Sequence, residues 1–178
     1  MSLLARVVAV LEAKGIPFAL IGASALTIHG VNRLTLDMDL LVVDPVCLDV
    51  QTWLGLAAEG VSVDVRRGDL TDPLAGVVRF EAPSETSVDL VIGKFVWQRE
   101  ILEKSRQALF AGLEIPVLEA VELILLKLYA GGHQDAWDIQ QLLTGPDRET
   151  LIAGVEQELP RLPKECSNFW RRILDLGC

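Results

Sequence analysis

The feature that most constrains this fold is a pair of acidic residues inside an apolar strand pattern, RLTLDMDLLVV at residues 33–43. Side chains two positions apart on a strand point to the same face of the sheet. Asp37 and Asp39 are therefore expected side by side, with Met38 and Leu40 on the opposite face. Two carboxylates in an apolar setting repel each other, and a divalent cation relieves that repulsion. The pair predicts a metal site that also takes a phosphate-bearing ligand.

The pair alone also fits a solvent-exposed strand on which Asp37 is a turn residue. A further carboxylate favours the metal interpretation, because Asp89 lies within SVDLVIG, another apolar strand pattern. Three carboxylates from neighbouring strands can form a cradle in which two metal ions hold a reacting phosphate. Asp64 in VSVDVRR is a rival for the third position, but its charged neighbours indicate a solvated strand. We therefore expect Asp89 to complete the site.

The segment before the acidic pair predicts a phosphate-binding turn. PFALI is an apolar strand pattern that runs into Gly22, Ala23 and Ser24 before a short helix pattern. Small residues at such a turn let backbone N–H groups approach an anion, and a helix N-terminus favours negative charge. Close packing of strand and helix is the other reason for small residues there, so the turn alone does not identify a ligand site.

The order of the patterns predicts the fold class. Strand and helix patterns mingle through the first two thirds of the chain, and helix patterns alone follow, which indicates an α+β fold with a mixed sheet. The chain has 178 residues, 51% of them hydrophobic, enough for a sizeable core. We expect an α/β core over residues 1–117 and a helical part over 118–178 packed on it, either as two parts or as a single domain. Helical patterns are predicted at residues 2–14, 46–58, 95–104, 118–132, 135–143, 148–158 and 164–175.

Composition limits the setting of the protein. The sequence has no apolar run of membrane-spanning length, and its N-terminal segment has the pattern of an amphipathic helix, not of a signal peptide. Cys47, Cys166 and Cys178 are widely spaced, which argues against a disulfide framework or zinc site and fits a reducing cytoplasm. The formal net charge of −9 gives a nucleic-acid substrate no long-range attraction. Such a substrate would need a local basic patch or metal ions.

The run IGASALTIHGVNRLTLDMDLLV resembles the nucleotidyltransferase superfamily of the DNA polymerase β kind. The signature of that superfamily is an apolar residue, Gly, then Gly or Ser, a spacer, and Asp-apolar-Asp. More narrowly, the chain is similar to small prokaryotic nucleotidyltransferases akin to the AbiEii toxins. It departs from their pattern at Ala23, where Gly or Ser is usual, and at Gly132, where Arg is frequent. The matching residues are Gly22, Ala25, Leu26, His29, Gly30, Arg33, Thr35, Lys127, Asp135 and Asp138.

The resemblance implies a nucleotidyltransferase fold and a Mg²⁺-dependent enzyme. Such an enzyme moves a nucleoside monophosphate from an NTP to an acceptor hydroxyl of a tRNA, a protein or a small molecule. The toxin likeness further implies an antitoxin protein as a partner. The alternative is a non-catalytic module that keeps the fold and binds a nucleotide or a partner, for which the departures at Ala23 and Gly132 argue.

The same resemblance implies roles for individual residues, and some have a structural alternative. Lys127 fits a contact to the triphosphate or a surface lysine whose charge reaches solvent. Asp135 and Asp138 near a helix start fit helix capping or a pair with Lys127. The implied catalytic and metal-binding residues are Asp37, Asp39 and Asp89; the nucleotide-binding residues are Gly22, Ala23, Ser24, Arg33 and Lys127; the accessory residues are Asp135 and Asp138.

Overall fold

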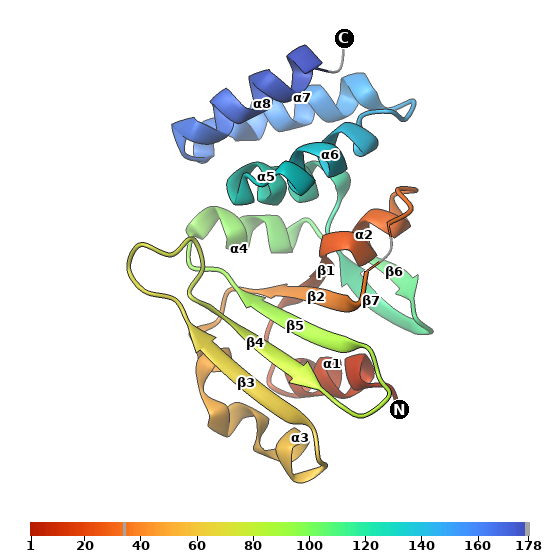
Figure 1. The fold of residues 1–178 in the computed structure, drawn as a ribbon, viewed down its shortest axis with the longest axis vertical. Coiled ribbons are helices and arrows are strands. Elements are labelled where there is room, and N and C mark those ends of the chain that lie inside the picture. Colours follow the sequence, from red (N-terminus) through yellow and green to blue (C-terminus); the bar gives the residue numbers. More distant parts are fainter. Residues whose placement is uncertain (34, 177–178) are drawn as a thin grey trace.

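The computed structural model describes residues 1–33 and 35–176, and within them seven strands form one mixed sheet (Figure 1). The strand order is β3-β4-β5-β2-β1-β7-β6, so the strand with the acidic pair, β2, lies at the centre. The strands are β1 Phe18–Ile21, β2 Asp37–Val42, β3 Ser62–Arg67, β4 Gly76–Glu81, β5 Ser87–Ile92, β6 Arg106–Phe110 and β7 Leu113–Val117.

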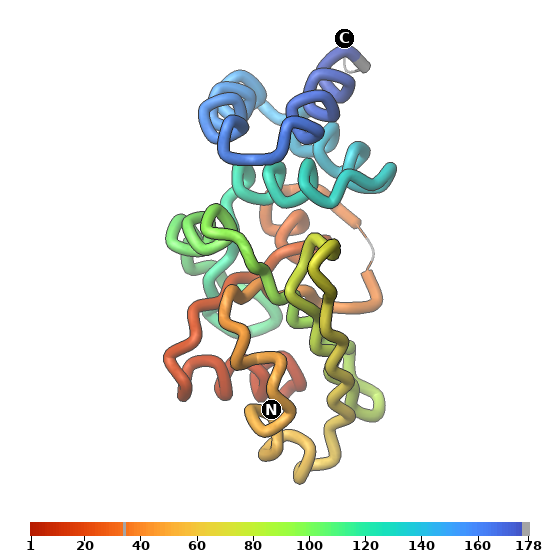
Figure 2. Tube along the Cα trace, turned by 90° about the vertical axis from the view of Figure 1, so that its left-hand side faces the viewer, coloured from red at the N-terminus to blue at the C-terminus, as the bar shows by residue number. Residues whose placement is uncertain are grey.

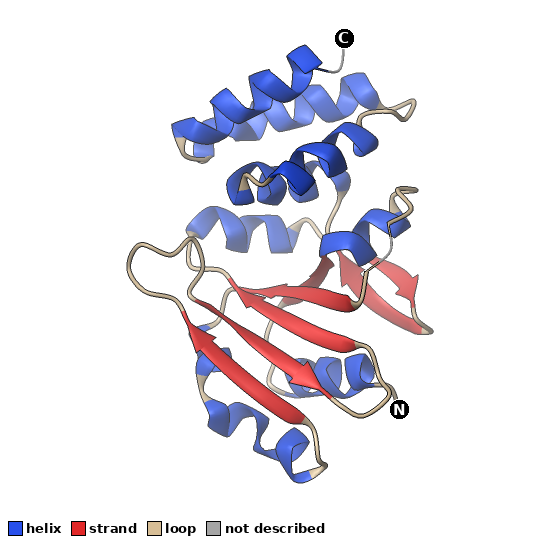
Figure 3. Cartoon of the chain, viewed as in Figure 1, coloured by secondary structure: helices blue, strands red, loops and turns tan. Residues whose placement is uncertain are grey.

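The helices flank this sheet and then gather at one end of the molecule. Figures 1 and 2 show α5 to α8 stacked beyond the sheet, with α4 between them and the strands. Figure 3 shows the same division between a strand-rich part and an all-helical end. The α-helices are α1 Leu3–Ala13, α2 Gly22–Ile28, α3 Leu54–Ala58, α4 Val96–Glu103, α5 Ala120–Ala130, α6 His133–Leu142, α7 Arg148–Glu158 and α8 Lys164–Leu176.

The two faces of the central strands differ, as the two-residue period of a strand requires. On one face Leu40, Leu90 and Phe80 are fully buried, and the Trp53 ring packs edge-on against Phe80 with 4.7 Å between the ring centroids. The other face carries Asp39 on β2. Burying the apolar face stabilises the sheet by about 1.5–3 kcal/mol for each large side chain. The face that carries the acidic residues is therefore available for a functional site.

The register of the sheet brings one polar row across four strands. β2 and β5 are parallel, with Asp39 opposite Asp89. β4 runs antiparallel to β5 with Arg79 opposite Asp89, and β3 runs antiparallel to β4 with Asp64 opposite Arg79. On the other side of β2, Ile21 of β1 lies opposite Asp39. Charged side chains that are up to 50 residues apart in the sequence therefore share one line across the sheet.

The α+β prediction with a mixed sheet and a helical C-terminal part is confirmed. The predicted continuous helix at 46–58 is wrong, because the segment forms two 3₁₀ turns, Pro45–Leu48 and Val50–Trp53, before α3. Asp49 interrupts it with an extended backbone, φ −88° and ψ 119°, and its Oδ1 accepts the N–H of Gln51. A short acidic side chain that accepts a nearby N–H competes with helix formation.

Two expectations from composition concern the same described part. Cys47 and Cys166 are free and buried there, whereas Cys178 lies outside the described residues. Within residues 1–33 and 35–176, every helix is too short or too polar to cross a membrane.

Candidate active site

Three carboxylates share the polar face of the central strands. Asp37 and Asp39 stand two residues apart on β2, and Asp89 stands opposite Asp39 on β5. Asp37 is additionally oriented by Thr35, whose hydroxyl donates to Asp37 Oδ1 at 2.7 Å. The rival Asp64 is about half exposed and pairs with Arg66 at 2.8 Å, two strands further along the row. The structure therefore brings Asp89, and not Asp64, to the acidic pair.

This crowding affects the pKa of Asp39. Burial raises its pKa to about 6, and the charges of Asp37 and Asp89 add to the effect, while Lys127 and Arg33 oppose it. Burial also raises the pKa of Asp89, against a lowering by Arg79. Both shifts indicate carboxylates that hold their negative charge at a free-energy cost in the absence of a cation.

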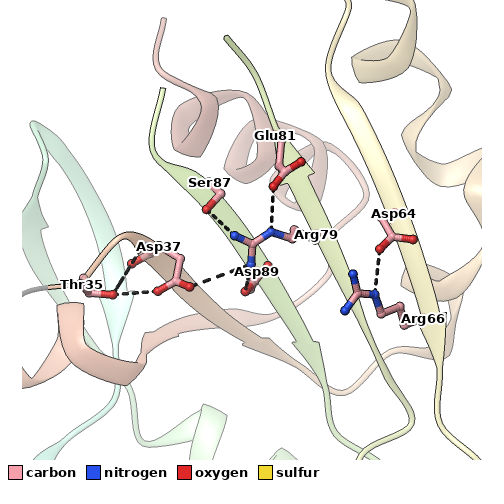
Figure 4. A network of polar contacts seen from close by, with 8 residues as sticks. All are labelled: Thr35, Asp37, Asp64, Arg66, Arg79, Glu81, Ser87 and Asp89. Carbon is pink, nitrogen blue, oxygen red and sulfur yellow. Dashed lines mark hydrogen bonds and ion pairs between the residues drawn. The ribbon is translucent and has the colours of Figure 1, made fainter. Parts of the chain in front are cut away.

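Arg79 is the residue that sequence reasoning missed. Figure 4 shows its guanidinium among four side chains on β4, β5 and β2. Nη1 contacts Asp89 Oδ2 at 2.8 Å and Asp37 Oδ2 at 3.9 Å. Nε donates to Glu81 at 3.0 Å and Nη2 donates to the Ser87 hydroxyl at 3.1 Å. The signal in the sequence is a cationic residue inside the apolar strand pattern GVVRFEA.

The turn between β1 and α2 touches the acidic cluster directly. Gly22 has φ +63°, and a Cβ added there would overlap Asp39 Oδ2. Glycine is required for two reasons, because the backbone is left-handed and because the carboxylate takes the space of a side chain. The helix begins at Gly22 itself, so Ala23 and Ser24 lie inside α2, where both are buried. Their side chains therefore pack in α2 instead of lining an open turn.

We expect Gly22→Ala to displace the Asp39 carboxylate. The rate of transfer should therefore fall by more than the loss of folding free energy alone explains. The left-handed backbone costs an alanine about 1–2 kcal/mol, and the overlap is relieved only if the short Asp39 side chain moves. Gly15→Ala is the matched control, because Gly15 has φ +64° and open space around its Cβ position. Urea unfolding and transfer assays on both variants test this. Equal activity losses in both would contradict the role of the Asp39 contact.

A second polar cluster ties the C-terminal helices to the loop before β2. Asp138 of α6 is fully buried, and its Oδ2 accepts from Lys127 Nζ at 2.5 Å and from Arg33 Nη1 at 2.6 Å. Asp135 Oδ1 lies 3.4 Å from Lys127 Nζ, and its Oδ2 accepts the N–H of Gly132 at 3.0 Å, as a capping residue does. Lys127 is buried at 8% exposure, so the surface-lysine interpretation is wrong.

Two cavities lie near the acidic cluster, and Pro73 and Leu74 line both of them. A cleft of about 330 Å³ is lined by Arg66, Arg79 and Asp89 together with the segment from Asp72 to Val77. A cavity of about 210 Å³ with mostly apolar walls reaches from Gly22 to Lys127 under α5. The first opens beside β4 and β5, and the second beside the turn and the C-terminal helices. Of the three carboxylates, Asp89 lines the first cavity and none lines the second.

The oxygen atoms of these carboxylates are suitable ligands for a divalent cation. Within residues 1–33 and 35–176, however, no group of three or more His, Cys, Asp or Glu is arranged to hold one. Hard oxygen donors suit Mg²⁺. Asp89 Oδ1 is buried without a hydrogen-bond partner, and a buried polar atom in that state indicates a missing cation or donor. The raised pKa of Asp39 points the same way. Arg79 now contacts the oxygens that an ion would use.

Comparison with known proteins supplies a family. The family model described as a nucleotidyl transferase of unknown function (DUF2204) matches residues 1–158. No curated protein matches the chain. Two structures of the antibiotic-resistance factor ANT(2″)-Ia share the fold: the crystal structure with adenylyl-2″-tobramycin (14% identity, TM-score 0.57, 89% of this chain and 96% of that one) and the solution structure (13%, 0.58, 89% and 90%). A protein of Thermotoga maritima assigned as a nucleotidyltransferase is also similar (16%, 0.54, 79% and 90%).

Proposed function

Because the chain belongs to a family of nucleotidyl transferases (DUF2204) and is thereby a nucleotidyltransferase, we propose that it moves a nucleoside monophosphate from an NTP to an acceptor hydroxyl with the help of Mg²⁺. The single observation that carries this proposal is the register that sets Asp89 opposite Asp39, two residues from Asp37. We take residues 1–117 as the part that holds this site and residues 118–178 as a helical part that contributes Lys127 and Asp138.

In this proposal Asp37, Asp39 and Asp89 hold the divalent cations. Bound there, the ions would neutralise charge on the phosphate oxygens and lower the pKa of the attacking hydroxyl. Asp89, whose side chain is 17% exposed and borders the larger cleft, accepts the proton of that hydroxyl. The hydroxyl oxygen forms a bond to the α-phosphorus, and the bond to the β-phosphate oxygen breaks, so that pyrophosphate leaves.

The nucleotide occupies the side of the cluster near Gly22. Lys127 and Arg33 both lower the pKa of Asp39, which supports a role for their positive charges beside the nucleotide. Asp138 orients the side chains of Lys127 and Arg33 by accepting a hydrogen bond from each of them. A triphosphate is stabilised by such fixed charges and by the backbone of Gly22–Ser24, the first residues of α2. Asp138 is therefore a positioning residue in this proposal, and Asp135 assists it at Lys127.

The acceptor class is the finer part of the proposal. A structural neighbour carries adenylyl-2″-tobramycin, so a small molecule is one candidate. The likeness of the acidic and lysine motifs to AbiEii-type toxins adds tRNA, with an antitoxin as partner, and a protein hydroxyl is a third candidate. All three acceptors present a hydroxyl, so the acidic cluster does not discriminate between them. The choice therefore depends on residues around Asp89 and not on the carboxylates.

Incubation with each α-³²P-labelled NTP, total tRNA and cell lysate tests the reaction. We expect label on an acceptor and release of pyrophosphate, both lost with EDTA and restored by Mg²⁺. Asp89→Asn should lower the transfer rate by about 10²-fold or more, and Asp64→Asn, which removes the rival carboxylate, should retain it. Absence of label, together with calorimetric NTP binding that does not depend on Mg²⁺, would instead identify a non-catalytic binding module.

A further inference from the structure

Arg79 forms an ion pair with the carboxylates that the proposed reaction needs. Its Nη1 lies 2.8 Å from Asp89 Oδ2 and 3.9 Å from Asp37 Oδ2, and its Nη2 and Nε donate to Ser87 and Glu81 (Figure 4). The Asp89 oxygen that Arg79 does not contact is buried without a partner. Arg79 therefore neutralises the cluster only in part.

Arg79 and a divalent cation compete for the same oxygens. Mg²⁺ binds carboxylate oxygens at about 2.0–2.1 Å, and an ion this close to Asp89 Oδ2 would repel the adjacent guanidinium. The side chain of Arg79 is 35% exposed, so it can leave without unpacking the core. Glu81, 58% exposed, stays beside Arg79 on the same strand as a second anchor. A metal ion on the cluster would therefore move Arg79 away from Asp89 and toward the cleft that it already lines.

A released Arg79 would have a second arginine, Arg66, beside it in that cleft. Arg66 lines the same space of about 330 Å³, and its present pair with Asp64 is largely exposed, so it is weak and easily exchanged. Arg67, which also lines the cleft, donates to the Leu48 carbonyl at 2.8 Å and is not free to join them. Two planar guanidinium groups beside Asp89 suit the oxygens of a phosphate. They would repel a polycationic acceptor.

We propose that Arg79 determines the class of acceptor: displaced from Asp37 and Asp89 by the metal ion, it binds with Arg66 a phosphate group of the acceptor molecule. The acceptor is then phosphate-bearing, either an RNA or a small sugar phosphate, and is not a polycationic compound of the tobramycin kind. This inference rests on the proposed function, because it assumes that the hydroxyl attacks beside Asp89.

Metal affinity tests the displacement without any transfer reaction. We expect Arg79→Gln to tighten Mn²⁺ binding by about five- to tenfold, measured by electron paramagnetic resonance or calorimetry, because removal of an ion pair of about 1 kcal/mol frees the carboxylates. Arg66→Gln removes the same charge from the same cleft but no contact to the cluster, so its effect should stay below about twofold. Arg79→Lys should lie between Arg79→Gln and the wild type. Unchanged or weaker Mn²⁺ binding in Arg79→Gln, or an equal gain in Arg66→Gln, overturns the displacement.

Labelling of defined acceptors tests the specificity. With Mg²⁺ and the preferred NTP, we expect label on total tRNA or on glucose 6-phosphate, which separates the two sources of phosphate, and none on tobramycin. Arg79→Gln should raise the acceptor KM by about tenfold, as loss of a charge-assisted contact does, and leave the KM for the NTP unchanged. Label on tobramycin, or an unchanged acceptor KM, overturns the inference. No label on any acceptor despite the expected Mn²⁺ result overturns the proposed function, and the acceptor assignment falls with it.

Discussion

Asp39→Asn is expected to abolish nucleotidyl transfer and, at the same time, to stabilise the metal-free protein at neutral pH. Loss of a carboxylate that would hold a charge-neutralising ion costs about 10³-fold in rate. The gain in stability has a separate cause. Burial, Asp37 and Asp89 raise the pKa of Asp39 from 3.8 to about 6, so its ionisation above that pH works against the fold. An asparagine of the same size carries no such charge.

The pH dependence gives this prediction its sign. Between pH 3.8 and about 6 the folded protein binds more protons at Asp39 than the unfolded chain does, so the contribution of this residue to stability falls as the pH rises. The full loss, on the order of 2–3 kcal/mol, is present above pH 6. Urea unfolding of both proteins in EDTA should show Asp39→Asn more stable at pH 7.5 and a shrinking difference toward pH 4.

Asp64→Asn serves as the control for this effect, because that carboxyl is about half exposed and pairs with Arg66. It should show neither the loss of transfer nor the gain in stability. A wild-type protein that is more stable than Asp39→Asn at pH 7.5 would contradict the crowding of the three carboxylates. Addition of Mg²⁺ should stabilise the wild type and leave Asp39→Asn nearly unchanged, since a bound ion removes the repulsion only where the carboxylate is present.

Asp138→Asn is expected to destabilise the protein by about 3 kcal/mol, the largest loss of stability among the variants considered. Asp138 is fully buried and its Oδ2 accepts from both Lys127 and Arg33. Removing one partner of a buried ion pair leaves uncompensated charge and costs about 3–5 kcal/mol. The lower figure applies because Asp135 remains 3.4 Å from Lys127 and Arg33 is 31% exposed. Unfolding in urea at pH 7.5 measures the change.

Asp135→Asn is the matched control on the same helix. Its carboxylate is 22% exposed and accepts the Gly132 N–H, so its loss should cost about 1 kcal/mol. If Asp138→Asn is no less stable than Asp135→Asn, the cluster has no structural role. Lys127→Met combined with Asp138→Asn should recover part of the stability, because removal of both charges leaves no buried lysine without its carboxylate.

Local pattern was sufficient for most of the elements. The period-2 alternation around Asp37 and around Asp89, and the turn residues between them, predicted β2 and β5 as strands with both carboxylates inside them. Lys127 within an apolar helix pattern and the aspartates at the start of the next helix were equally visible. The predicted helix at 46–58 failed because Asp49 accepts a local N–H, a competition that periodicity does not record.

Strand pairing is what the pattern could not supply. Arg79 meets Asp89 across the consecutive antiparallel strands β4 and β5, but only the parallel pairing of β5 with β2, strands far apart in the sequence, sets both residues beside Asp37. The meeting of Arg33 and Lys127 on one oxygen of Asp138 likewise needs α5 and α6 to pack near the loop before β2. A pair between Lys127 and Asp135 or Asp138 was among the predicted alternatives, and it is found at Asp138, whereas the contacts of Arg79 and Arg33 escaped residue-by-residue reasoning.

Sequence by itself determined which side chains share a face, since two-residue and 3.6-residue periods are properties of the local backbone. It thus set Asp37 beside Asp39 and kept both off the apolar core. Only the tertiary structure decided which distant charges neutralise them, because register and helix packing are chosen by the burial of the whole apolar surface. Arg79 lies against Asp89, and Asp138 holds Lys127 and Arg33, as consequences of that global choice.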